Sequence, residues 1–286
     1  MRRVCVVMGV ILALVVPAVP VHAGTTGILV FSVFSRSDAK AGLHTMPATG
    51  GTETKLAGTT SAYRPRWAPD GSGLAYIHAR SIRWIDADGS NDHVLVGHAA
   101  MPAHHDFPST IAWSPDGKQL LLPLYSSGFR TVRLYRVNIA TKRFHVVLKG
   151  AYDADWSTAN RIVAVKAGTI MTMDPDGSNR TVISTHDATW LRWSPDASML
   201  VLQRNLNSGG DIFVMGSDGS NPTNITNSKS FDWWPSWSPD SSRIVWSKSR
   251  DISSPGNFFA MDPDGSNVTQ LTATPKLDEY EPDWAA

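Results

Sequence analysis

The residues in this sequence that first suggest chemistry are paired aspartates in a recurring six-residue turn. The pattern Asp-x-Asp-Gly-Ser-Asn occurs at 86–91, 174–179 and 262–267, and a copy that begins with glycine occurs at 216–221. A calcium loop of the EF-hand type needs glycine at its sixth position and glutamate at its twelfth. Here glycine is the fourth residue and a strand-like run follows. Asp and Asn side chains bond to nearby backbone in such turns, so we interpret the pattern as hairpin capping and predict no metal and no other cofactor.

The densest polar cluster in a loop-like stretch is His104-His105-Asp106. Histidines and a carboxylate can bind a metal ion or act as an acid–base pair, if further ligands such as His98 or Asp153 converge on them. Adjacent residues of a strand point in opposite directions, so both histidines reach one ion only if the loop bends. A structural or solvated role is therefore the favoured interpretation.

Sequence patterns typical of hydrolases and nucleotide-binding enzymes are absent. The chain has no Gly-x-Ser-x-Gly elbow, no His-Glu-x-x-His pair and no phosphate-binding glycine loop. It has 26 basic and 25 acidic residues and no basic stripe, which argues against nucleic acid and anionic membranes as partners.

The first 23 residues have the pattern of a cleavable signal peptide. Arg2 and Arg3 precede the apolar run Val4 to Val16, and Val21-His22-Ala23 suits cleavage after Ala23. The run is too short to span a bilayer as a helix. We expect residues 1–23 to direct export and residues 24–286 to form one domain, without membrane insertion after cleavage. The one cysteine, Cys5, lies in this signal, so the mature domain contains no disulfide.

A repeat of the type Trp-Ser-Pro-Asp-Gly organises the rest of the chain. Successive copies lie 46, 43, 37, 44 and 47 residues apart, close to the roughly 40–45 expected of a four-stranded propeller blade. The segments between copies are short, β-branched and aromatic, with no helical period. The six tryptophans that mark the copies, which we expect in the core between sheets, are Trp67, Trp113, Trp156, Trp193, Trp237 and Trp284.

Each repeat predicts four antiparallel strands, a to d. In one copy these are 64–67, 74–77, 82–85 and 93–96. The N-terminal part supplies only strands b, c and d, at 27–34, 43–47 and 52–56, and its strand a is expected at 281–284. The predicted fold is therefore an all-β, six-bladed β-propeller that is closed by pairing of N- and C-terminal strands, which hides the sheet edges.

The combination Pro-x-Trp-Ser-Pro-Asp, an apolar strand, Met-Asp-x-Asp-Gly-Ser-Asn and Leu-Thr, best seen in 235–272, resembles the repeat of TolB-type, WD-like propellers. The resemblance covers the chain after the signal. It implies a six-bladed propeller in an exported, periplasmic bacterial protein. The repeats begin shortly after Ala23, so the resemblance predicts the propeller without the α/β domain that precedes it in TolB.

Strand direction divides the predicted loops between two faces. The a–b and c–d turns share a regular-turn face, whereas the b–c and d–a connections share an irregular-loop face, where binding groups usually collect. We predict that a protein or cell-envelope ligand binds to this second face of a monomeric, periplasmic or secreted and non-enzymatic propeller. The candidate binding residues there are His104, His105, Asp106, Tyr125, Arg130, Arg204, Asn207, Asp232, Trp233, Trp234, Lys248, Arg250 and Asp251.

The alternative is an enzyme on the same face, of the propeller-type polysaccharide lyase kind, which would use a metal or a His and Arg pair on an acidic polysaccharide. Its residues would come from His104, His105, Arg130, Arg204 and Arg250. Two or more histidines and a carboxylate converging in one pocket over the channel would favour this alternative. No catalytic residue is assigned.

Overall fold

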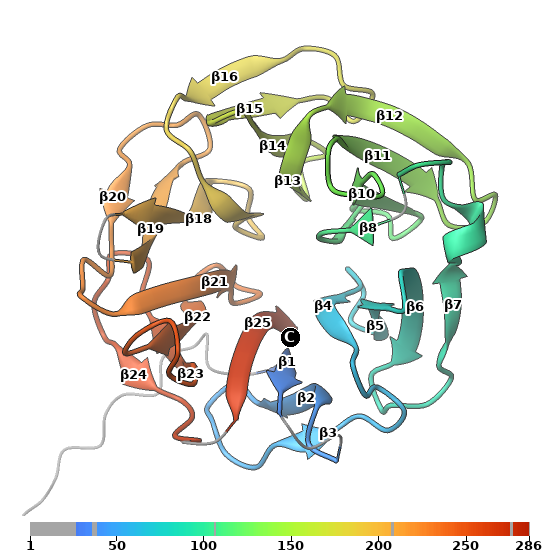
Figure 1. Cartoon of the computed structure of the whole chain (residues 1–286). Helices are drawn as coiled ribbons and strands as arrows, with labels where there is room; N and C mark the ends of the chain where they lie inside the picture. Colours follow the sequence, from blue (N-terminus) through green and yellow to red (C-terminus); the bar gives the residue numbers. More distant parts are fainter. Residues whose placement is uncertain (1–26, 36–38, 106, 207–208, 275–276, 286) are drawn as a thin grey trace, which may run out of the picture.

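The computed structural model describes residues 27–285, except 36–38, 106, 207–208 and 275–276. In this part of the chain, six antiparallel sheets form a closed ring around a central channel (Figure 1). The predicted six-bladed β-propeller is confirmed. The expected signal peptide lies outside the described residues.

The N- and C-terminal strands close the ring, as predicted. Strand a of blade 1 is β25 (Asp278–Ala285), which pairs with β1 (Ile28–Phe34). The same sheet continues through β2 (Gly42–Pro47) and the short β3 (Thr54–Lys55).

The other sheets follow in chain order. Blade 2 contains β4 (Tyr63–Trp67), β5 (Gly73–His78), β6 (Ser81–Asp86) and β7 (His93–Val96). A short 3-10 helix, η2 (His98–Ala100), leads to blade 3, which contains β8 (Phe107–Pro108), β9 (Ala112–Trp113), β10 (Gln119–Tyr125), β11 (Val132–Asn138) and β12 (Phe144–Lys149). Blade 4 contains β13 (Ala151–Trp156), β14 (Ile162–Lys166), β15 (Thr169–Met173) and β16 (Thr181–Ser184).

Blade 5 contains β17 (Thr189–Trp193), β18 (Met199–Leu206), β19 (Gly209–Gly216) and β20 (Thr223–Asn224). Blade 6 contains β21 (Phe231–Trp237), β22 (Ile244–Ser249), β23 (Asn257–Met261) and β24 (Thr269–Gln270). The labelled first strands β25, β4, β8, β13 and β21 lie nearest the centre of the ring (Figure 1).

The core consists of apolar side chains between neighbouring sheets. One cluster joins Ile77 and Ile82 of blade 2 to Leu122 of blade 3. The six repeated tryptophans are 4–9 % exposed. Trp113 packs edge-on against Trp84 of the preceding blade, at 5.9 Å between ring centroids. The prediction of a core role for the repeated tryptophans agrees with this burial.

The aspartate turns cap hairpins, as predicted. The Ser220 amide donates to Asp218 Oδ1 at 2.9 Å, and the Ser178 amide makes the corresponding bond to Asp176 at 2.8 Å. Gly219 has a φ of 87°, and a Cβ there would lie 2.1 Å from the Ile183 carbonyl oxygen of the preceding blade. Glycine is thus required both by the left-handed turn and by the close approach of two blades.

The innermost strands carry β-bulges that the sequence pattern did not predict. In blades 1, 2, 5 and 6 the residue three positions before the repeated tryptophan is left-handed, with φ of 57°, 55°, 57° and 52° at Glu281, Arg64, Trp190 and Trp234. The strand register shifts at each of these places. A bulge re-aims a side chain, and a bulky residue with positive φ is rare. Four blades therefore share an unusual backbone conformation at the same position of their innermost strands.

Candidate functional site

The residues immediately before the repeated tryptophans follow one another around the channel, and all of them except the core residue Ala112 line a cavity in it. From blade 1 to blade 6 the ring consists of Asp283, Arg66, Ala112, Asp155, Arg192 and Ser236. The order Asp, Arg, small residue thus occurs twice around the ring. Opposite charges are brought together across the channel by this arrangement.

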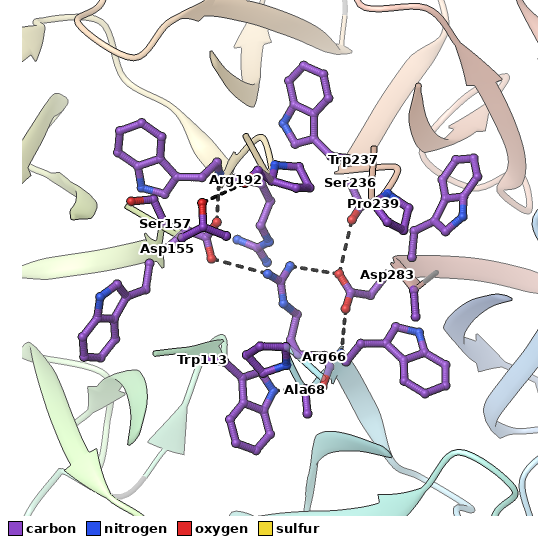
Figure 2. Close-up of a pocket in the computed structure, with 18 of the residues that line it drawn as sticks. Arg66, Ala68, Trp113, Asp155, Ser157, Arg192, Ser236, Trp237, Pro239 and Asp283 are labelled. Atoms are coloured by element: carbon purple, nitrogen blue, oxygen red, sulfur yellow. Dashed lines mark hydrogen bonds and ion pairs between the residues drawn. The ribbon is translucent and has the colours of Figure 1, made fainter. Parts of the chain in front are cut away.

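Arg66 holds the centre of the ring. Its Nη1 lies 3.2 Å from Asp283 Oδ1 and its Nη2 lies 3.4 Å from Asp155 Oδ1, so one side chain of blade 2 joins blades 1 and 4 (Figure 2). Burial alone would lower the pKa of Arg66, but Asp283 and Asp155 outweigh burial and raise it. Arg66 is therefore held firmly in its charged form.

The two aspartates also bind the backbone of the next blade. Asp283 Oδ2 accepts the Trp67 amide at 2.7 Å, and Asp155 Oδ2 accepts the Trp193 amide at 2.8 Å. Burial raises the pKa of Asp283, which Arg66 partly counteracts. Both carboxylates thus link adjacent blades.

Arg192 completes the group that we call the septum, which consists of Arg66, Asp155, Arg192 and Asp283. Arg192 donates to the Leu191 carbonyl at 2.7 Å and to Thr110 Oγ1 at 3.3 Å, and its Nη1 lies 3.8 Å from Asp153 Oδ1. Burial lowers the pKa of Arg192, and repulsion from Arg66 adds to this effect. The two arginines meet at the channel centre (Figure 2) and line cavities on both sides of the septum.

On the regular-turn face, the channel widens into a cavity of about 490 Å³, which we call the funnel. All six repeated tryptophans line it, with prolines of the a–b turns such as Pro69 and Pro239 at its rim. The septum residues and Ser236 form its polar part (Figure 2). The largest of the described cavities therefore lies on the face opposite the one predicted to bind, and the core tryptophans also form its wall.

On the irregular-loop face, the channel ends in a narrow pocket of about 20 Å³. Its lining includes the four left-handed residues Arg64, Trp190, Trp234 and Glu281, which we call the mouth. Arg64 Nε donates to Glu281 Oε1 at 2.9 Å, and the Arg64 amide donates to Glu281 Oε2 at 2.8 Å. The Arg64 guanidinium also lies over the Trp190 ring at 4.9 Å.

A continuous series of aromatic rings extends from the mouth. Phe231 stacks on Trp233 at 5.5 Å, and Trp233 stacks on Trp234 at 5.7 Å. Trp234 then contacts Trp190 edge-on at 5.8 Å and Tyr280 at 5.4 Å. These five residues, the aromatic track, are all partly exposed. They offer a semi-rigid apolar surface beside a charged mouth.

The predicted binding residues have different environments. Trp233 and Trp234 belong to the aromatic track. Asp232, which precedes them in β21, is fully buried. It accepts from Trp246 Nε1 at 2.7 Å and from Ser228 Oγ at 2.8 Å, and Lys248 Nζ lies 3.7 Å away. Burial raises the pKa of Asp232. The buried Asp232 therefore fixes the strand that carries Trp233 and Trp234.

The remaining candidates do not converge on one point. His105 is buried beside Tyr135, whereas His104 is exposed with a φ of 66°. Tyr125 packs on Phe129, and the next residue, Arg130, is exposed. Three further candidates form local contacts: Arg204 covers the Phe213 ring, and the exposed Arg250 pairs with Asp251 at 3.1 Å. Asp106 and Asn207 lie outside the described residues.

The convergence that the lyase alternative requires is not found in the described part of the chain. Neither the funnel nor the mouth is lined by a described histidine. No group of three or more His, Cys, Asp or Glu is placed to hold a metal ion there. In the same residues, no helix is long and apolar enough to cross a membrane.

Several residues that line the channel were not predicted from the sequence, namely Arg64, Trp190 and Glu281 at the mouth and the septum residues. A signal for them exists. Two positions fixed relative to the repeated tryptophan, one and three residues before it, vary among the copies and carry charged or large aromatic side chains in most of them. Variable positions within a regular repeat are where one blade differs from its neighbours.

Comparisons of the structure with solved structures place the fold. TolB from Acinetobacter baumannii matches with a TM-score of 0.75 and 17% identity, over 92% of this chain and 67% of that chain. The fold is TolB-like. A putative TolB from Agrobacterium tumefaciens matches this TolB-like propeller with a TM-score of 0.66 and 17% identity, over 91% of this chain and 98% of that chain.

Structures with other activities also share the TolB-like architecture. Oligogalacturonate lyase in complex with manganese matches with a TM-score of 0.53 and 18% identity, over 88% of this chain and 75% of that chain. At such identities the likeness shows the fold alone, because propellers host both binding and catalysis. No family model and no curated protein sequence matches the chain.

Proposed function

We propose that this chain is an exported, non-enzymatic, monomeric propeller that binds a protein or another cell-envelope component through its irregular-loop face. In this proposal residues 1–23 are a signal peptide and the mature domain acts in the periplasm or outside the cell. The mouth and the adjoining aromatic track are the centre of the binding surface.

The observation that carries the proposal is the backbone conformation of Trp190 and Trp234. Two bulky residues are held left-handed, with φ of 57° and 52°, and both line the channel mouth. A left-handed residue other than glycine costs roughly 1–2 kcal/mol, and such strain gathers at functional sites. Partly exposed tryptophans beside an arginine are also the side chains that most often dominate the energy of protein interfaces.

The remaining predicted residues would form the outer part of this surface. His104, Arg130 and Arg250 are exposed, and mobile charged side chains at a rim favour the rate of encounter more than the final affinity. We therefore expect their removal to weaken binding less than removal of Trp233. Asp232 and Lys248 are expected to act by supporting the track.

The test is affinity capture from a cell-envelope extract with the wild-type chain and two tryptophan variants. Trp233→Ala removes a half-buried ring from the aromatic track. Trp84→Ala removes a half-buried ring that lines a separate cavity beside the regular turns of blades 2 and 3 and serves as the matched control. We expect at least about tenfold less captured partner with Trp233→Ala, since loss of a central aromatic residue costs about 2 kcal/mol. Equal capture by both variants would contradict the assignment of the face.

A further inference from the structure

Arg64 is positioned with one edge of its guanidinium fixed and the other edge open. Its Nε and its own backbone amide are both bound by the Glu281 carboxylate, which also accepts from Ser32 Oγ at 3.1 Å. Trp190 covers one face of the guanidinium at 4.9 Å. The terminal nitrogens, Nη1 and Nη2, have no hydrogen-bond or ion-pair partner among the described residues. The side chain is 23% exposed.

This geometry suits a planar anion. A carboxylate binds arginine best through two parallel N–H bonds, and the Nη1–Nη2 edge offers such a pair. Glu281 and Trp190 restrict the rotation of the side chain before any ligand arrives. An arginine that is already oriented loses less conformational entropy on binding.

The two other arginines beside Arg64 already have carboxylate partners. The narrow pocket at the mouth is lined by three cations, Arg64, Arg66 and Arg192, and by one carboxylate, Glu281. Arg66 is already paired with the septum aspartates on the funnel side, and Arg192 lies near Asp153. Among these three arginines, Arg64 is therefore the one whose Nη1–Nη2 edge is open to a ligand from the irregular-loop face.

We propose that Arg64 anchors a carboxylate of a bound protein segment, while an apolar or aromatic neighbour of that carboxylate packs on Trp234 and Trp233. The inference rests on the proposed function, because it names the chemistry recognised at the same surface. The carboxylate is an Asp or Glu side chain or the carboxyl terminus of the segment. The open guanidinium edge of Arg64 attracts the carboxylate, and the adjoining aromatic track receives its apolar neighbour.

The experiment uses a displayed library of random short peptides, selected on the purified full chain. Peptides whose binding is lost with Trp233→Ala are retained as ligands of the mouth. We expect an excess of Asp, Glu or free carboxyl termini among them. Each acidic peptide is then compared with versions in which Glu is replaced by Gln or the carboxyl terminus is amidated, which distinguishes the two sources of the carboxylate.

The deciding measurement is the coupling between the peptide carboxylate and Arg64. Arg64→Gln should weaken binding of the acidic peptide at least about tenfold, because it removes a charge-assisted bidentate pair, and should leave binding of the amide version unchanged. Arg64→Lys should recover little, since lysine has no planar edge. Arg143→Gln, an exposed arginine beyond the end of β11 in the c–d connection of blade 3, is the control and should not change the affinity.

Three outcomes are informative. The selected peptides could show no preference for acidic residues and bind the wild-type chain and Arg64→Gln with equal affinity. That result would overturn this inference and leave the proposed function standing. A library that gives no peptide sensitive to Trp233→Ala overturns both. If Arg64→Gln does not fold, competition on the wild-type chain decides: glutarate should displace an acidic peptide and glutaramide should not, and equal displacement refutes the carboxylate anchor.

Discussion

The septum and the mouth are built from the same strands, but their charged groups have different numbers of partners within the protein. At the septum, the carboxylates of Asp155 and Asp283 bind Arg66 and the backbone of the next blade. At the mouth, Arg64 is bound along one edge only. The positions are two residues apart in the repeat. The charged groups of the septum are therefore bound within the protein, whereas Arg64 at the mouth keeps an edge available to a ligand.

Backbone strain separates the two ends as well. The septum residues have no left-handed backbone, whereas all four mouth residues are left-handed. Such a conformation persists only where the surrounding structure fixes it. The closed ring provides this support, because the mouth includes Glu281 from the C-terminal strand and Arg64 from blade 2, which are joined by hydrogen bonds.

Deletion of residues 281–286 tests the dependence of both ends on ring closure and should have the largest effect. The deletion removes Glu281 from the mouth, Asp283 from the septum and the buried Trp284 from the core. We expect loss of the cooperative thermal transition, followed by circular dichroism. The matched control deletes six residues, 250–255, from an irregular loop.

The control should cost little, because Lys248 pairs with Asn257 and the shortened chain can close through a two-residue Ser249-Gly256 hairpin loop. An unchanged melting temperature after the C-terminal deletion would refute closure by β25. A collapse of both variants would show that the propeller tolerates no deletion of this size.

The arginine pair Arg66 and Arg64 tests the comparison directly. Arg66→Gln leaves Asp155 and Asp283 buried without their cation, and we expect a loss of about 3–5 kcal/mol in the free energy of unfolding. Arg64→Gln leaves one carboxylate, Glu281, which is 9% exposed and keeps its hydrogen bonds from an amide and from Ser32, so its loss should be smaller, about 1–2 kcal/mol. Urea denaturation of both variants measures the difference. Equal losses would show that the mouth is as structural as the septum.

The fold was predictable because its information is local and repeated. Trp-Ser-Pro-Asp turns and Asp-Gly-Ser-Asn turns set the strand register in each copy, and the incomplete N-terminal unit predicted closure by the C-terminal strand. The site was less predictable because its contacts are distant: Arg64 and Glu281 are 217 residues apart. Asp232 looked like a surface group beside two tryptophans, yet it is fully buried under Trp246. Neither fact follows from local pattern.

Another carboxylate of β25, Glu279, belongs to neither end of the channel. It is fully buried and accepts hydrogen bonds from Thr272 and Thr274, with Glu53 beside it and His44 Nδ1 at 3.5 Å from Glu53. Burial first, and then the charge of Glu53, raise the pKa of Glu279 to about 7, above its ordinary value of 4.5. The folded state is therefore more stable when Glu279 is protonated.

The sign of the resulting pH dependence follows from this shift. Because the folded-state pKa lies above the unfolded-state value, the stabilisation is complete below about pH 4.5 and is lost as the pH rises through about 7. The loss should reach about 3 kcal/mol. Urea denaturation of the wild type and of Glu279→Gln at about pH 5 and about pH 8 isolates this group, since the other titrating residues are common to both chains. The variant should lose much less stability than the wild type over this interval. Parallel pH profiles would mean that Glu279 is already ionised in the fold.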